Sequence, residues 1–165
     1  MEVVLTSFFE YAEEFEHFEE SINHIMLEAI YSTIIQMYLS KFLKSKEKIK
    51  LAGSRNSFSL KATQEITNAI DLSSLDANGH ERVSDYLKIF THYMNIFGIS
   101  DLTVLYYEIQ DTKRDLELFP RSFLDIVLHK RSDLRNEQIE DILSGIKFGN
   151  KYKYFVDNVM EMMKN

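Results

Sequence analysis

Apolar residues recur every three or four positions along most of this chain, which is the spacing that places one stripe of a helix against a core. The spacing is clearest over 22–44 and 83–97. Residues that interrupt secondary structure are rare, because the 165 residues include one proline and five glycines. The pattern therefore predicts an all-α protein, with residues 1–165 forming a single helical domain.

The first third of the chain contains two predicted helices. Over 8–20, an apolar and aromatic stripe lies opposite a row of glutamates, as in an amphipathic helix. Ser21 is placed to act as an N-cap or a kink before a second helix over 22–44. Because this second helix has apolar residues on two sides, we expect it to be the central helix.

Polar, glycine-containing segments separate the next two predicted helices. Ser59 is positioned to cap a helix that runs to about residue 70, and a break over 71–79 follows. The helix over 83–97 should end at Gly98, since glycine suits the left-handed turn that often follows a helix end.

Four further helices are expected in the last third of the chain. Ser100 or Asp101 can cap a helix over 102–110, although its β-branched and aromatic residues leave a strand there as the alternative. Pro120 suits the first turn of the next helix. Asp133 is a possible start for another, which should end at Gly145 or Gly149, and a last helix spans 152–163.

Seven or eight helices of irregular length result from this division. No repeat of constant period is visible in the sequence. Both an irregular bundle and a short helical-repeat (TPR-like) array are compatible with such a pattern.

The net charge of −7 is concentrated at one end of the chain. Residues 1–40 contain eight glutamates and no lysine or arginine. Proteins that coat nucleic acid neutralise its phosphates with basic side chains, so we expect no direct binding of nucleic acid. The same acidic helix permits an alternative function, an acidic inhibitor that occupies the basic groove of a nucleic-acid enzyme.

Compartment and redox chemistry are only loosely constrained by the composition. The chain has no cysteine, which excludes disulfides and thiolate metal sites. Its longest uncharged run, Ala29–Ser40, is shorter than the roughly twenty residues that cross a bilayer. Together with the acidic start, these features predict a cytoplasmic protein without a membrane segment.

No group of residues in the sequence has the pattern of a catalytic or metal site. Glu14 and His17 have the E-x-x-H spacing of carboxylate-bridged metal bundles, but a second copy is missing and a solvated acidic face explains them. Nucleophile elbows and glycine-rich phosphate loops are also missing. We therefore predict that the protein is not an enzyme and holds neither a metal nor a cofactor.

The segment Arg131-Ser-Asp-Leu-Arg135-Asn136 resembles the R-N-x-x-x-H region of small helical ribonuclease toxins of the HEPN type. Neither arginine is followed by the histidine of that motif, and His129 precedes both. This resemblance implies a second function class, an HEPN-like toxin, antitoxin or anti-defence protein whose ribonuclease activity is lost. A helix surface explains the same residues equally well.

Two other segments resemble the carboxy-terminal helical-repeat domain of Rgg/MutR-type regulators, which are peptide-responsive transcription factors. One is Ile22-Asn23-His24-Ile25-Met26-Leu27-Glu28-Ala29-Ile30, after an acidic aromatic helix, and the other is Val83-Ser84-Asp85-Tyr86-Leu87. The tryptophan that usually follows the second motif is missing, with Tyr93 as a loose substitute, and so is the DNA-binding helix-turn-helix.

The resemblance implies a non-enzymatic regulatory or interaction module that senses a peptide or binds a partner protein, as a homodimer. Helical arrays bind peptides through amide side chains, which pair with the backbone, and through aromatic pockets. We accordingly select Asn23, Arg82, Tyr93 and Asn95 as candidate peptide- or partner-binding residues. For Asn23, a helix cap or an interhelical hydrogen bond is the alternative role.

Overall fold

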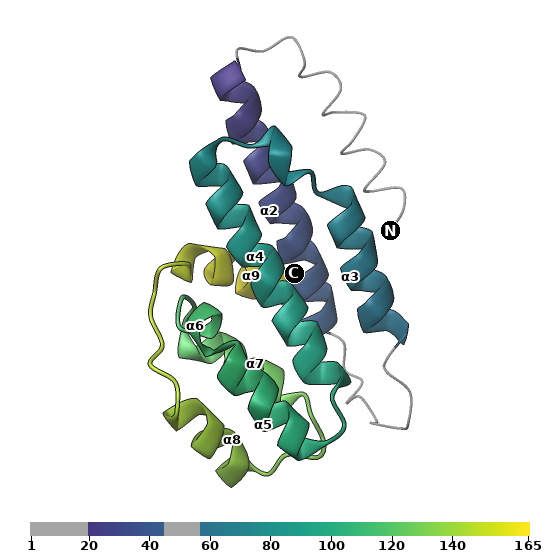
Figure 1. Ribbon diagram of the computed structural model, residues 1–165, viewed down its shortest axis with the longest axis vertical. Coiled ribbons are helices and arrows are strands. Elements are labelled where there is room, and N and C mark those ends of the chain that lie inside the picture. Colours follow the sequence, from purple (N-terminus) through teal and green to yellow (C-terminus); the bar gives the residue numbers. More distant parts are fainter. Residues whose placement is uncertain (1–19, 45–56) are drawn as a thin grey trace.

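The computed structural model describes residues 20–44 and 57–165, and these residues contain eight α-helices and a short 3-10 helix but no strand (Figure 1). The all-α prediction is therefore confirmed. The elements in chain order are α2 (Glu20–Lys44), α3 (Ser57–Ala69), η2 (Leu72–Ser74), α4 (Ala77–Gly98), α5 (Leu102–Asp111), α6 (Lys113–Leu116), α7 (Arg121–His129), α8 (Asn136–Ser144) and α9 (Lys153–Lys164).

The three longest helices lie side by side, with α3 antiparallel to α2 and α4 (Figure 1). Aromatic contacts fix the parallel register of α2 and α4: Phe42 meets Phe97 edge-on at 4.2 Å between ring centroids, and Tyr38 meets Phe90 at 6.4 Å. Edge-to-face pairs of this kind add to the stabilisation from burial alone. The two helices are thereby joined over their C-terminal halves.

The shorter helices α5 to α8 gather at one end of the long helices, as Figure 1 shows. The helix α4 packs against α2, α3, α5, α6 and α7, so it connects the long helices to this group. We expected 22–44 to be the central helix. Among the described elements, α2 packs mainly against α3, α4 and α9, whereas α4 packs against a larger number of them.

The last helix closes the fold onto the first one described. Residues of α9 pack extensively against α2, which lies more than a hundred positions earlier in the chain. In a linear repeat array, each unit contacts only its neighbours in sequence. The irregular bundle is therefore the architecture that forms.

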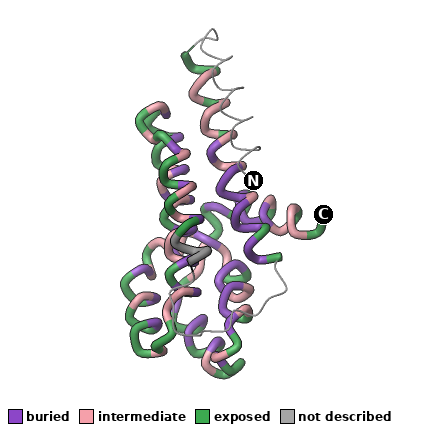
Figure 2. The backbone as a smooth tube through the Cα atoms, turned by 90° about the vertical axis from the view of Figure 1, so that its right-hand side faces the viewer, coloured by how far each residue is buried: buried purple, intermediate pink, exposed green. Residues whose placement is uncertain are grey.

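Buried residues concentrate where α2, α4, α7 and α9 meet, whereas the first turns of α2 extend beyond the core (Figure 2). Ile22 and Ile25 were expected on the packed face, yet Ile25 is 66% exposed and Ile22 is 42% exposed. Tyr31, Ile35 and Leu39, which belong to the second apolar side of this helix, are buried as expected. The helical period fixes which residues share a face but not which turns have a neighbour to pack against.

Several predicted helix ends are correct and others shift by a few residues. Asp101 caps α5, since its Oδ1 accepts from the backbone N–H groups of Thr103 and Val104 at 2.8 and 3.1 Å. Helix, not strand, is therefore the structure of 102–110. Gly98 is the last residue of α4, but its φ does not lie in the left-handed region that we expected there.

Three predicted helix starts are wrong. Ser21 lies inside α2, and α3 begins two residues before Ser59. Asp133 does not begin a helix, since α8 starts at Asn136. Its carboxylate accepts hydrogen bonds from Arg131. Pro120 directly precedes α7, close to its predicted place in the first turn.

The four-residue helix α6 was not predicted, because a single turn is too short to show a period. The helix expected over 8–20 lies outside the described residues. None of the helices in 20–44 and 57–165 has both the length and the hydrophobicity of a membrane-spanning segment.

Candidate functional site

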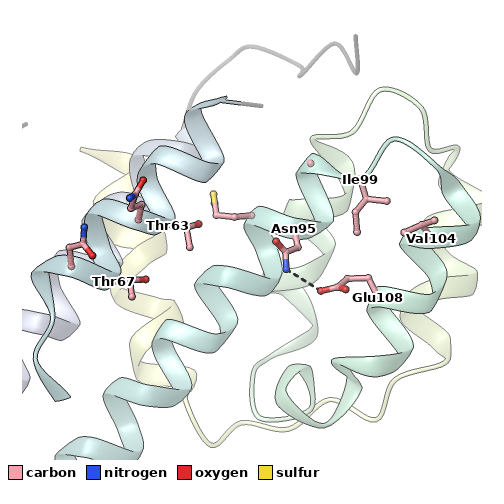
Figure 3. Close-up of a pocket in the computed structure, with 10 residues that line it drawn as sticks. Thr63, Thr67, Asn95, Ile99, Val104 and Glu108 are labelled. Carbon is pink, nitrogen blue, oxygen red and sulfur yellow. Dashed lines mark hydrogen bonds between the residues drawn. The ribbon is translucent and has the colours of Figure 1, made fainter. Parts of the chain in front are cut away.

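A groove of about 780 Å³ lies between α3 and α5, with α4 as its floor (Figure 3). Its walls combine amide and hydroxyl side chains with apolar ones. The lining residues in the described part of the chain are Thr63, Gln64, Thr67, Asn68, Met94, Asn95, Gly98, Ile99, Val104 and Glu108.

The wall formed by α5 is positioned by a cap and by its buried face. Asp101 fixes where the helix begins, and Leu105 and Ile109 bury completely against the core. Val104 and Glu108 are four residues apart and therefore share a face, which lies beside the buried one. As a result, a 51% exposed valine and a carboxylate border the groove together, as Figure 3 shows.

One hydrogen bond joins the floor of the groove to the wall formed by α5. The Nδ2 atom of Asn95 on α4 donates to Oε1 of Glu108 on α5 at 3.3 Å (Figure 3). This distance is at the long end of the range for N–H···O bonds. The Oδ1 atom of Asn95 and its second N–H are additional hydrogen-bonding groups, so the amide can pair with a ligand without losing Glu108.

A smaller hollow of about 360 Å³ lies at the other end of α4, beside the start of α9. Its cations are bound by neighbouring carboxylates. Arg82 forms a two-pronged ion pair with Glu28 of α2, at 2.5 and 2.8 Å, which raises the pKa of the guanidinium. Lys151 Nζ lies 2.8 Å from Glu81 Oε1. The ion pairs of the hollow therefore hold α2, α4 and the start of α9 together.

A buried hydrogen bond and a ring contact beneath this hollow give Asp85 and Tyr86, from the segment Val83–Leu87 that resembles Rgg/MutR-type regulators, a structural role. The hydroxyl of Tyr152 donates to Asp85 Oδ2 at 2.6 Å, and burial, together with this bond, raises the pKa of Tyr152 to about 12. Tyr86 stacks on Phe155 with ring centroids 4.1 Å apart. Both motif residues thus attach α4 to the start of α9.

The structure separates the four candidate residues that the sequence suggested. Asn95 is exposed in the groove, and Arg82 lies in the hollow. Thirteen residues along α4 separate them, which corresponds to about 20 Å. Asn23 is partly buried near the start of α2. These residues do not form a single site.

Tyr93 is a core residue and is not available to a ligand. It is 1% exposed and packs edge-on against Phe123 at 4.8 Å between ring centroids. Burial raises the pKa of its hydroxyl well above the ordinary range. A surface ligand cannot reach it, so Tyr93 is removed from the candidate contact residues.

Arg131 of the ribonuclease-like segment is also inside the fold. It is 3% exposed, its Nε and Nη2 atoms donate to the Asp133 carboxylate at 2.9 and 2.6 Å, and its Nη1 atom donates to the carbonyl of Ile96. The guanidinium therefore joins the α7–α8 connection to the end of α4. Within the described residues, this arginine is held by structural bonds rather than directed at a substrate.

Metal binding was not predicted, and the described residues contain no group of three His, Asp or Glu side chains arranged to hold an ion. Glu14 and His17 lie outside the described part of the chain. Glu20 and His24, which neighbour them in sequence, are 3.8 Å apart across one turn of α2.

Sequence reasoning missed the groove residues on α3 and α5. Gln64 and Asn68 are one turn apart in a helix that was predicted, and the pattern of exposed amides could have selected them. Glu108 carries no such signal, because only the fold places it opposite Asn95.

Searches against protein-family models, curated proteins and solved structures find no match to this chain. The resemblance to Rgg/MutR-type regulators accordingly stays a prediction.

Proposed function

We propose that this protein is a non-enzymatic regulatory module that binds a peptide segment of a partner in the groove between α3 and α5. The observation that carries the proposal is the lining of the groove, where Gln64, Asn68 and Asn95 stand beside apolar side chains. Each amide offers both a donor and an acceptor, as a peptide backbone requires. Apolar residues next to them provide contacts for the peptide's side chains.

The scarcity of titratable side chains among the described lining residues of the groove favours binding over catalysis. Acid–base chemistry generally uses two titratable side chains whose environments separate their pKa values. Glu108 is the single titratable residue among the described lining residues. A binding role needs no such pair, so the groove fits a module that recognises rather than transforms its ligand.

The resemblance to Rgg/MutR-type regulators implies that this chain is the sensor part of a peptide-responsive regulator, acting as a homodimer. The groove is compatible with that role. The peptide contact would then lie in the groove, while the Asp85-Tyr86 pair holds α4 against α9.

A displayed library of random heptapeptides, selected on the purified full chain, tests the proposal. We expect selected peptides whose affinity falls about tenfold or more in Asn95→Ala, because a buried peptide group would lose its partner. Asn150→Ala is the matched control, since it removes an exposed amide that does not line the groove and should leave the affinity unchanged.

Filling the groove provides a second, independent variant. Asn68 is exposed on α3, so Asn68→Trp adds bulk to the groove without disturbing the core. It should abolish binding of the selected peptides while the thermal unfolding midpoint stays close to wild type. Peptides that bind Asn95→Ala and Asn68→Trp as tightly as wild type would show that the groove is not the binding site.

A further inference from the structure

This inference rests on the proposed function. The charge of the groove indicates a more specific class of ligand. We propose that the groove takes an extended peptide in which a lysine or arginine binds Glu108 and a neighbouring aliphatic residue packs on Val104. The peptide is a segment of a partner protein, and the recognised chemistry is a cation beside an apolar side chain.

Glu108 supplies the first argument. Of the described residues that line the groove, it alone carries a charge. Glu28, Glu81 and Glu140 each have an arginine or lysine within 2.8 Å or less, whereas no such ion pair to Glu108 occurs among residues 20–44 and 57–165. A partly buried carboxylate without a cation attracts a ligand cation more strongly than a fully solvated one.

The hydrogen bond from Asn95 does not replace that cation. Asn95 is a neutral donor at 3.3 Å, so the negative charge of Glu108 remains. The bond holds the carboxylate toward the floor of the groove, where Figure 3 shows the two side chains facing each other. Two carboxylate oxygens can accept several hydrogen bonds, so a ligand ammonium or guanidinium can be added.

The composition of α5 supplies the second argument. Its sequence, from Leu102 to Asp111, contains two acidic residues and no basic one. It also exposes three large hydrophobic side chains, Val104 at 51%, Tyr106 at 36% and Tyr107 at 69%. Residues three and four positions apart are neighbours on a helix, so Val104 lies next to both Tyr107 and Glu108. An acidic and apolar wall of this kind complements a basic and aliphatic peptide.

The opposite wall has a different chemistry, which suggests how the peptide is oriented. Gln64, Thr67 and Asn68 of α3 are uncharged hydrogen-bonding residues. They suit the peptide backbone, whose groups are neutral donors and acceptors. The charge-bearing side chain then points toward α5, and the backbone runs along α3.

Selection of random heptapeptides on three versions of the full chain tests this assignment. Wild type should enrich peptides that carry Lys or Arg next to an aliphatic residue. Glu108→Lys should enrich Asp or Glu at the same place, because reversing the groove charge reverses the preferred ligand charge. Glu137→Gln on α8 is the control, as it removes an exposed carboxylate far from the groove in sequence and should leave the selection unchanged.

Binding measurements complete the test. A peptide selected on wild type should lose about tenfold or more in affinity with Glu108→Gln, and its remaining binding should depend less on salt. Peptides that bind the groove without a basic residue, and equally with Glu108→Gln, would overturn this inference and leave the proposed function standing. If no peptide is enriched above the Asn68→Trp variant, both are wrong.

Discussion

At the scale of single residues, polar side chains stabilise this protein most where the fold buries them. Arg131 is the clearest example, because its side chain is charged yet buried and bonds to the Asp133 carboxylate and the Ile96 carbonyl. Removing one partner of such a pair leaves the other without compensation, which costs more than the pair itself contributes.

Arg131→Ala should therefore lower the free energy of unfolding by about 3 kcal/mol, measured by urea denaturation. Arg121→Ala is the matched control: Arg121 and Glu140 form an ion pair with both side chains about half or more exposed, and such pairs contribute less than about 1 kcal/mol. Equal effects of the two substitutions would contradict the structural role of Arg131.

The Tyr152–Asp85 bond links stability to pH. Tyrosine ionises with a pKa of 10.0 in an unfolded chain, and in the fold burial and the bond to Asp85 raise it to about 12. A raised folded pKa favours the neutral hydroxyl, so its contribution is complete below about pH 10 and is lost as the pH rises to about 12.

Chemical denaturation at a series of pH values should show this alkaline loss, and Tyr152→Phe should reduce it. The substitution should also cost about 1–2 kcal/mol at neutral pH, because the buried Asp85 loses its donor. Tyr154→Phe is the neighbouring control and should cost little at neutral pH, since Tyr154 is 79% exposed. An alkaline loss of the same size in Tyr152→Phe would exclude Tyr152 as its source.

At the scale of elements, an N-cap residue fixes where α5 begins. Asp101 accepts two backbone N–H groups in the first turn, and α5 forms the acidic wall of the groove. The sequence left Ser100 and Asp101 as alternatives, and the structure selects Asp101.

Asp101→Ala should destabilise the protein by about 1 kcal/mol and reduce the protection of α5 amides from hydrogen exchange. Ser100→Ala should change neither quantity, because Ser100 is exposed and is not the cap. The same loss of protection from Ser100→Ala would show that the cap is assigned to the wrong residue.

At the scale of the whole molecule, the contact between α2 and α9 joins distant parts of the chain. Phe155, Val156 and Val159 of α9 are buried, so removing the helix would expose the apolar surface of α2. A chain ending at Tyr152 should therefore lose cooperative thermal unfolding, followed by circular dichroism. A chain that lacks only the exposed Lys164 and Asn165 should unfold as wild type does.

The sequence by itself determined the helical class and most helix positions. Helical periodicity is a local property, since residues three and four apart share a face whatever lies elsewhere in the chain. The cap at Asp101 and the interruption before α7 at Pro120 are local for the same reason. The short helix α6 escaped prediction because one turn contains no period.

Only the tertiary structure decided which of these residues meet. It buried Tyr93, paired Arg82 with Glu28 and Arg131 with Asp133, and left Ile25 exposed. It also brought α3 and α5 together across α4, so that Asn95 faces Glu108. These contacts join residues up to 54 positions apart, and the helical pattern contains no information about which helix lies next to which.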